Sequence, residues 1–510
     1  MIDQPNQRRS LTLQAFSLLL AKTLAFIFAF ALPILLTRSL SQDEYGLFKQ
    51  VFLIITTATA LLPLGFGMSA YYYLPRENDP GRRGQVILNI MLFNLVMGGA
   101  ACLVLLFWPG LIATIFSDPT IASYAASVGI VILLWLFSSC LETVAVANQE
   151  LRLAAIFIAA GQLTRTILLL AAALIFDSVQ ALVYAAVIHG VLQSLVLLWY
   201  VFSSFPGFWR AFDWSLTLKQ VAYALPFGLA GLLYTFQTDL HNYFVSNRYS
   251  AATFAVYSIG VAQLPFIGII RDSVSSVILP RISYLQEQGQ AREIVVLLAN
   301  AIRKLAAIVL PVYAFLMVTG QEFLTVLFTS AYAESWPIFA INLTLLPISL
   351  LEVDAVVRAY ESHRFWVVKL QVVLCGLMVL ALWYGIPRFG LIGAISVVVG
   401  INFLLRALLA ARFSRVLGLN RSDLWLFKDV AKLALASAIA GFLCLAVHSI
   451  IIGSEPLVVL VVCFAAFAAV YVSMILLLRV PTSDEREKAR SGVARLQHFV
   501  YVGRSANSVP

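Results

Sequence analysis

The stretch "GQLTRTILLLAAALIF", residues 161–176, decides the class of fold. Together with the apolar residues that precede it from 153, it is long enough to cross a bilayer as a helix, because a span needs about 20 largely apolar residues. Arg165 lies inside this run, and a guanidinium keeps its proton at any ordinary pH. Placing that charge in hydrocarbon costs at least roughly 2.5–3.5 kcal/mol on insertion scales. The stretch therefore predicts a membrane helix that carries a permanent charge.

The composition of the whole chain agrees with a membrane location. Of its 510 residues, 61% are hydrophobic and 12% are charged, and the mean hydropathy is +0.92. A soluble domain has about 45–50% apolar and about 25% charged residues. The chain is therefore expected to be an all-α, polytopic membrane protein.

Apolar runs of spanning length recur along the sequence and predict about 14 transmembrane helices. The predicted runs are 10–37, 46–74, 85–107, 122–147, 153–176, 179–202, 218–246, 251–278, 300–328, 336–361, 366–385, 391–413, 428–452 and 456–479.

Lysine and arginine are concentrated in alternate connections between these runs. The sparsely basic side holds only Arg38, Lys49, Arg248 and Arg388. Because basic loops stay in the cytoplasm, both termini are predicted to be cytoplasmic. The net charge of +9 then follows from topology, and no nucleic-acid partner is needed to explain it.

An internal repeat relates the two halves of the chain. "SLSQDEYGLFKQ" (39–50) follows the first run and "RYSAATFAVYSIG" (248–260) follows the seventh, with Ser41 aligned to Ser250 and two aromatic positions aligned as well. Glu150 and Glu361 align at a similar offset. Six helices per copy is an even number, so the copies share one orientation about a pseudo-two-fold axis along the membrane normal.

The repeat predicts the organisation of the chain. We expect an N-terminal six-helix bundle (1–210), a C-terminal six-helix bundle (211–420), two additional helices (421–480) and a cytoplasmic tail (481–510).

Three motifs resemble one family of transporters. They are "LTRSLSQDEYGLFKQVFLI" (36–54), "VILPRISYL" (277–285) and "FGLIGAISVVVG" (389–400), and their order is similar to that in polysaccharide-type flippases. These are the O-antigen and exopolysaccharide transporters of the multidrug/oligosaccharidyl-lipid/polysaccharide (MOP) superfamily. Fourteen helices favour this branch over the multidrug branch, which usually stops at twelve.

The resemblance implies a function as well as a fold. It implies two bundles around a central cavity that opens alternately to each side of the bacterial inner membrane. It also implies transport of an undecaprenyl-pyrophosphate-linked oligosaccharide from the inner to the outer leaflet, with membrane lipids as surroundings and a polysaccharide polymerase and chain-length proteins as candidate partners.

Charged residues inside the runs are the candidate binding residues, because such residues are expensive in hydrocarbon. Arg165 and Lys22 lie on the order of 18 Å into their runs at 1.5 Å per residue, near the bilayer midplane. With Arg271 in the second half, they are expected to line a cationic cavity that suits a pyrophosphate. The alternative is that each pairs with a carbonyl or carboxylate of another helix and only settles the bundle.

Other ionisable residues are candidates for coupling or gating. The resemblance implies a role for Asp239 in cation coupling, and the alternative is a structural hydrogen bond. Asp272 is expected to be a counter-ion of Arg271 or an interface group. His189 is more typical of a packed histidine than of a ligand.

Acidic residues at the inner ends of two runs predict gate ion pairs with nearby arginines. Glu142 is expected to pair with Arg152, and Glu352 and Asp354 with Arg358; the alternative is that they are solvated helix ends.

Motifs of other functions are missing from the sequence. No GxxxxGK[ST], HExxH or GxSxG motif occurs, and the five cysteines form no CxxC pair, so we expect no enzyme activity, catalytic residue, cofactor or metal. Two alternatives stay open. A multidrug-type, cation-coupled exporter would need an acidic, apolar pocket, and a membrane polymerase or ligase would need a long external loop.

Overall fold

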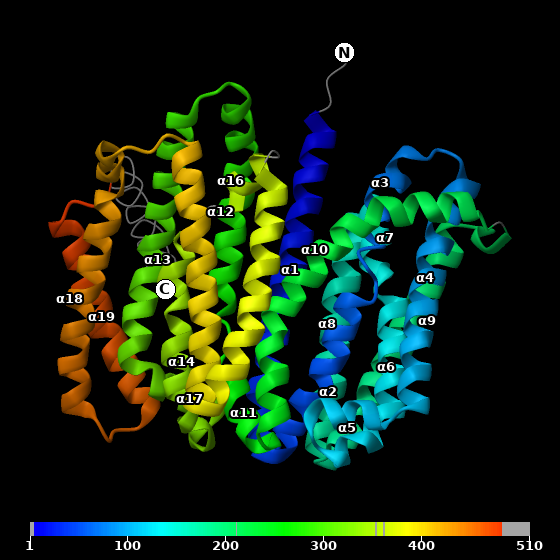
Figure 1. Ribbon diagram of the computed structural model, residues 1–510, viewed down its shortest axis with the longest axis horizontal. Helices are drawn as coiled ribbons and strands as arrows, with labels where there is room; N and C mark the ends of the chain where they lie inside the picture. Colours follow the sequence, from blue (N-terminus) through cyan, green and yellow to red (C-terminus); the bar gives the residue numbers. More distant parts are fainter. Residues whose placement is uncertain (1–4, 211, 352–353, 361–362, 482–510) are drawn as a thin grey trace, which may run out of the picture. The chain divides into compact units, whose positions relative to one another are not determined.

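The computed structural model describes residues 5–210, 212–351, 354–360 and 363–481, and their side chains except those of 5–16, 210, 265, 354 and 364. Throughout these residues the chain is helical, and they contain no β-strand (Figure 1). The predicted all-α class is confirmed.

The helices follow one another with short connections. The α-helices are α1 (Pro5–Ser39), α2 (Gln42–Leu61), α3 (Met68–Tyr73), α4 (Pro80–Phe107), α5 (Gly110–Phe116), α6 (Ala125–Ser138), α7 (Cys140–Ala147), α8 (Leu151–Phe176), α9 (Val179–Ser204), α10 (Trp214–Arg248), α11 (Ala251–Gly260), α12 (Pro265–Glu287), α13 (Ala291–Phe328), α14 (Trp336–Leu343), α15 (Leu345–Ser349), α16 (Asp354–Ala359), α17 (Arg364–Val416), α18 (Lys428–Ile451) and α19 (Pro456–Leu477). Short 3-10 helices are η1 (Leu74–Arg76), η2 (Pro119–Tyr124), η3 (Phe208–Arg210), η4 (Ser330–Ser335) and η6 (Arg421–Phe427).

Among the described residues, ten helices are long and apolar enough to cross a membrane, so the chain is a multi-pass membrane protein. The difference from the expected fourteen has a local cause at each place. Two of the expected runs join in α17, which bends where Gly390 adopts a φ of 61°. Glycine reaches such a φ without strain, because it has no Cβ.

Other expected runs are interrupted or shortened. The run 251–278 breaks after Gly260 and resumes as α12 at Pro265, and 336–361 is divided among α14, α15 and α16. Proline favours the first turn of a helix and disfavours helix in the residue before it, which fits a break at Pro265. In α2, three charged residues near the N-terminus lower the hydropathy of an otherwise apolar helix.

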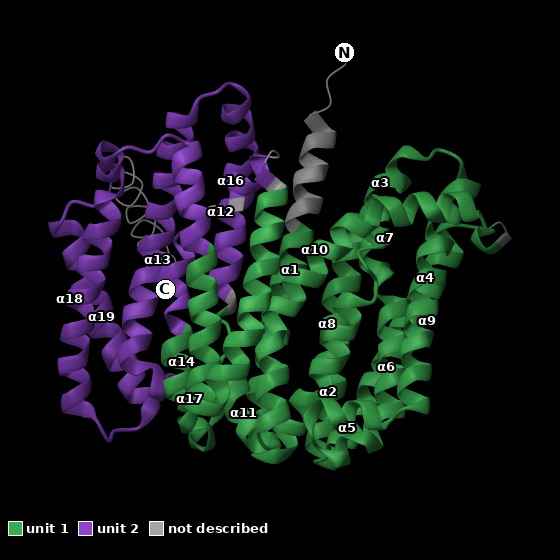
Figure 2. Cartoon of the chain, viewed as in Figure 1, with its two compact units in different colours: residues 1–265, 324–342, 365–405 green, residues 266–323, 343–364, 406–510 purple. Residues whose placement is uncertain are grey.

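The chain forms two compact units, which Figure 2 colours separately. Unit 1 comprises residues 1–265, 324–342 and 365–405, and unit 2 comprises residues 266–323, 343–364 and 406–510. This partition differs in kind from the bundles expected from the repeat, which stay a prediction.

Unit 1 is built on the packing of α4 and α9 against α6, and of α1 and α9 against α8. Its core is apolar and fully buried, as shown by Ile87 of α4, Val144 of α7 and Leu197 of α9. In water-free surroundings such close packing supplies the stability that the hydrophobic effect gives to soluble proteins.

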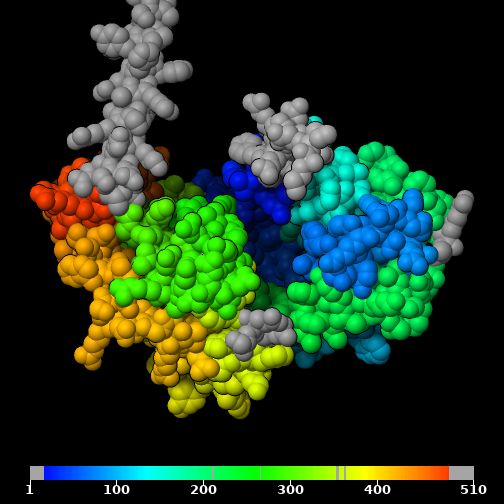
Figure 3. All heavy atoms as spheres, turned by 90° about the horizontal axis from the view of Figure 1, so that it is seen from above, coloured from blue at the N-terminus to red at the C-terminus, as the bar shows by residue number. Residues whose placement is uncertain are grey.

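In unit 1, the side of which in Figure 3 runs from blue to green, α3 packs against η1 and α7, and α4 packs against η3. Arg76 stacks on Tyr72 at 3.5 Å, Arg83 donates a hydrogen bond to Asn148, and the Tyr200 hydroxyl donates to Glu150 at 2.7 Å. These contacts satisfy the groups of the helix ends.

The two aligned serines of the repeat have the same structural role. Each is the N-cap of a helix: Ser41 accepts a hydrogen bond from the Glu44 N–H in α2, and Ser250 accepts one from the Thr253 N–H in α11. Their backbone angles agree within a few degrees (φ −64°, ψ 164° and φ −61°, ψ 161°). An N-cap of this kind stabilises a helix by about 0.5–2 kcal/mol.

The two capped helices pack directly against each other. A Cβ added to Gly46 of α2 would lie 1.8 Å from the carbonyl oxygen of Ala251 in α11. Only glycine lets the two backbones approach so closely.

Unit 2 carries the last two helices on α13. Cys444 of α18 and Cys463 of α19 belong to one buried apolar cluster, and Phe315 of α13 packs against this cluster. His448 of α18 hydrogen-bonds Glu322 of α13 at 2.8 Å, and the Tyr471 hydroxyl donates to the Ala307 carbonyl at 2.9 Å.

The close approach at Gly46 predicts a stability difference between two glycines. Gly46→Ala should destabilise the protein by about 1–3 kcal/mol, because the methyl group forces α2 and α11 apart. Gly99→Ala, in α4, is the matched control, since a Cβ there meets no atom within 4 Å. Thermal unfolding in detergent measures both. Equal unfolding temperatures for the two variants would contradict the packing.

Candidate functional site

Arg165 of α8 is held by an aromatic ring. Its guanidinium carbon lies 4.4 Å from the centroid of the Trp135 ring in α6. The residue is partly buried, its Nε has no hydrogen-bond partner, and it makes no ion pair within the described residues. A cation over a desolvated indole gains about 2 kcal/mol or more. The positive charge is therefore anchored but not neutralised.

Trp135 is itself fixed in place. Its Nε1 donates a hydrogen bond to the Ala186 carbonyl of α9 at 3.0 Å, and its ring lies edge-on to His189 at 5.7 Å and to Phe52 of α2 at 6.1 Å. Nothing in the sequence marked Trp135 as a site residue. A tryptophan in an apolar run is ordinary, and only the fold shows that its face meets Arg165.

Lys22 and Glu142, predicted separately, are brought together. Lys22 Nζ of α1 lies 3.2 Å from Glu142 Oε1 of α7, with 55% and 44% of the side chains exposed. The expected pairing of Glu142 with Arg152 is wrong, because the Glu142 carboxylate pairs with Lys22 of α1 instead. Both side chains remain partly exposed, so a further charged group could contact them.

Asp239 of α10 faces α2. Its Oδ2 accepts a hydrogen bond from the Thr57 hydroxyl at 3.1 Å, and Tyr243, one turn further along, donates to the Leu53 carbonyl at 3.4 Å. Asp239 is half-buried. The hydrogen bond that was the alternative to cation coupling is present, and coupling itself stays a prediction.

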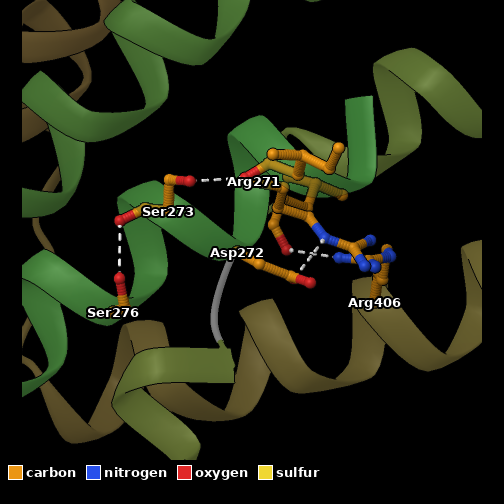
Figure 4. Close-up of polar contacts among 7 residues, drawn as sticks. Arg271, Asp272, Ser273, Ser276 and Arg406 are labelled. Carbon is orange, nitrogen blue, oxygen red and sulfur yellow. Dashed lines mark hydrogen bonds and ion pairs between the residues drawn. The ribbon is translucent and has the colours of Figure 1, made fainter. Parts of the chain in front are cut away.

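In unit 2, Arg271 and Asp272 are adjacent on α12 and form an ion pair, with 3.9 Å between Arg271 Nε and Asp272 Oδ1. Figure 4 shows their side chains extending toward the same side as Arg406 of α17, whose Nη1 donates to the Leu351 carbonyl at 3.4 Å. Ser273 and Ser276 lie further round the helix and donate back to its own carbonyls. Asp272 is largely exposed.

The predicted gate residues of the second half are incompletely described. Arg358 is exposed in the last turn of α16, Glu352 lies outside the described residues, and so does the side chain of Asp354. A gate formed by these residues stays a prediction.

The part of the chain that the structure describes holds no cluster of three or more histidine, cysteine or acidic side chains that could bind a metal. The five cysteines are free thiols, and all but Cys102 are buried. Buried free thiols of this kind pack as small apolar residues.

Solved structures with the same fold are membrane transporters. The lipid II flippase MurJ in an inward closed conformation matches with a TM-score of 0.69 over 92% of this chain and 99% of that chain, at 13% identity. A multidrug resistance MATE family transporter of the MOP superfamily in its inward-facing conformation matches with a TM-score of 0.57 over 81% and 96%, at 16% identity. A MOP superfamily transporter from Pyrococcus furiosus, described as having a binding pocket of reverse polarity, matches with a TM-score of 0.52 over 82% and 94%, at 16% identity. At these identities the likeness shows the fold.

The sequence itself matches one family model. No curated protein matches, but the model described as polysaccharide biosynthesis protein matches residues 35–337, more than half of the chain. The resemblance to polysaccharide-type transporters is thereby confirmed. The chain belongs to the polysaccharide biosynthesis protein family and has the fold of the MOP superfamily.

Proposed function

We propose that the protein is a flippase that moves an undecaprenyl-pyrophosphate-linked oligosaccharide from the inner to the outer leaflet of the bacterial inner membrane, with both termini in the cytoplasm. The family match and the fold shared with a lipid II flippase support transport of a lipid-linked sugar. The same comparisons favour a transporter over an enzyme. A polysaccharide polymerase and chain-length proteins are the partners that such a pathway requires.

The observation that carries the proposal is the uncompensated charge of Arg165. Lys22 has Glu142 as its counter-ion, and Arg271 has Asp272. Arg165 stacks on Trp135 and has no carboxylate among the described residues. An unpaired cation in an apolar helix is costly unless a mobile anion can neutralise it. A pyrophosphate supplies such an anion during each transport cycle.

The head group and the tail of the substrate then take different routes. The pyrophosphate-sugar head contacts the cationic residues, while the polyprenyl tail stays in lipid. Binding of equal strength on both sides would move nothing net, so removal of the product or an ion gradient must set the direction. Asp239, which hydrogen-bonds Thr57 and is half-buried, is the candidate group for coupling to a cation.

A cation-coupled exporter of the multidrug type is the second candidate. The carboxylate of Asp239 and the fold shared with a MATE transporter favour it. The sign of the transported charge separates the two functions, because Arg165 attracts an anion and repels a cationic drug.

Transport in proteoliposomes tests the proposed function. With an undecaprenyl-pyrophosphate oligosaccharide, Arg165→Gln should lower the initial rate at least tenfold, since a hydrogen bond to a charged group contributes about 1.5–3 kcal/mol. Arg165→Lys should keep part of the rate. Arg248→Gln, at an exposed helix end, is the control. A wild-type rate no higher than that of empty liposomes would exclude the flippase.

The support that Trp135 gives to Arg165 predicts a graded series. Trp135→Leu should lower the transport rate about threefold to tenfold, because the cation–π contact and the fixed position of the guanidinium are lost. Trp135→Phe keeps an aromatic face, so its transport rate should lie between those of Trp135→Leu and the wild type. The same rate for Leu and wild type would show that the stacking has no role in transport.

The ion pair of Lys22 and Glu142 predicts rescue by exchange of the charges. Lys22→Glu and Glu142→Lys should each slow transport, because like charges then face each other at about 3 Å. The double exchange should recover a stable protein, as measured by thermal unfolding. If Lys22 also binds the pyrophosphate, stability will return without the transport rate. Failure of the double exchange to restore stability would show that the two residues are not coupled.

A further inference from the structure

Polar side chains occur on α8 and α9, two helices that pack against each other. On α8 they include Gln162, Arg165 and Thr166, which share one helix face by their spacing of three and four residues, and on α9 they include His189 and Gln193, four residues apart. We call these five residues the α8–α9 seam. Apolar residues predominate in both helices, so buried polar groups on them are costly unless they are hydrogen-bonded.

Two nitrogen atoms of the seam are buried without a hydrogen-bond partner. They are Nε of Arg165 and Nδ1 of His189. His189 is nine-tenths buried, with 9% of its surface exposed. Because an unsatisfied buried polar group costs about 1–3 kcal/mol, two of them in one place indicate an unseen partner.

The two residues lie against the same wall, the ring of Trp135. The Arg165 guanidinium lies over the face of Trp135, and the His189 ring stands at its edge. A negatively charged ligand at this wall would therefore interact with both residues at once.

The helices α8 and α9 approach each other closely at Gly161. Gly161 has no side chain, and a Cβ there would lie 2.9 Å from the Gln193 amide nitrogen, so Gln193 packs along α8. The Arg165 side chain as a whole is only partly buried, so a ligand can reach the exposed part of its guanidinium, and donation from the buried Nε requires the guanidinium to turn.

We propose that Arg165 and His189 together bind one phosphate oxyanion, with Arg165 donating from Nε and His189 from Nδ1. The proposal rests on the proposed function and adds His189 to the residues that hold the pyrophosphate. It goes beyond the expectation that His189 is a packed residue. A ring with its proton on Nδ1 is required, and an oxyanion would stabilise that tautomer.

The same chemistry could come from the carrier lipid or from free pyrophosphate. Native mass spectrometry of the full-length protein distinguishes them, with undecaprenyl pyrophosphate and inorganic pyrophosphate as separate probes. If the site serves transport, the lipid should bind and inorganic pyrophosphate should compete only weakly. Binding of inorganic pyrophosphate as tightly as the lipid would assign the site to free anions and overturn a role in lipid recognition.

Three substitutions identify the donor atom. His189→Phe keeps the ring shape without a donor and should weaken binding of undecaprenyl pyrophosphate about tenfold. His189→Asn places an amide nitrogen close to the position of Nδ1 and should stay within about threefold of wild type. Tyr184→Phe, on the exposed side of α9, is the matched control. Thermal unfolding shows whether each variant is folded. If His189→Phe does not fold, His189→Asn still tests the proposal.

The outcomes separate the inference from the proposed function. Wild-type binding by His189→Phe together with loss of binding by Arg165→Gln would overturn the role of His189 and leave the flippase proposal intact. Loss of binding in His189→Asn with an unchanged unfolding temperature would equally overturn donation from Nδ1. Wild-type binding by Arg165→Gln would instead remove the basis of the proposed function.

Discussion

A permanent positive charge in an apolar helix is the constraint on which the rest of the protein depends. Arg165 cannot lose its proton, and the described residues offer it no carboxylate. The face of Trp135 replaces part of its lost hydration but leaves the charge in place. Such an arrangement favours the binding of an anion, and the carrier lipid of the proposed function would supply one.

The other intramembrane charges differ from Arg165 in having partners within reach. Lys22 pairs with Glu142, and Arg271 pairs with its own neighbour Asp272. Partly exposed ion pairs contribute little to stability, because water screens them and their side chains lose freedom. Weak pairs can exchange partners at low cost, so they suit residues that release one charge and take up another as a substrate moves past.

The sequence contained much of the fold but little of the contact geometry. Apolar runs predicted the helices, and the aligned serines Ser41 and Ser250 proved to cap equivalent helices. The bend at Gly390 and the break before Pro265 were missed, because a run of apolar residues does not reveal where a helix changes direction. Arg165 was recognisable as unusual, since a charge in hydrocarbon is costly. Its partner Trp135 could not be recognised from the sequence. The position of Trp135 depends on the packing of α6 against α9, and the spacing of residues does not reveal that packing.

The proposed function requires Arg165 to select for a negative charge on the carrier lipid. Binding to the protein in lipid nanodiscs tests it most directly, by comparing two glycolipids with the same glycan, one linked through pyrophosphate and one through a neutral polyprenol. The wild-type protein should prefer the pyrophosphate-linked lipid at least tenfold, and Arg165→Gln should lose most of that preference. Equal affinity of the wild type for both lipids, or an undiminished preference in the variant, would contradict the account.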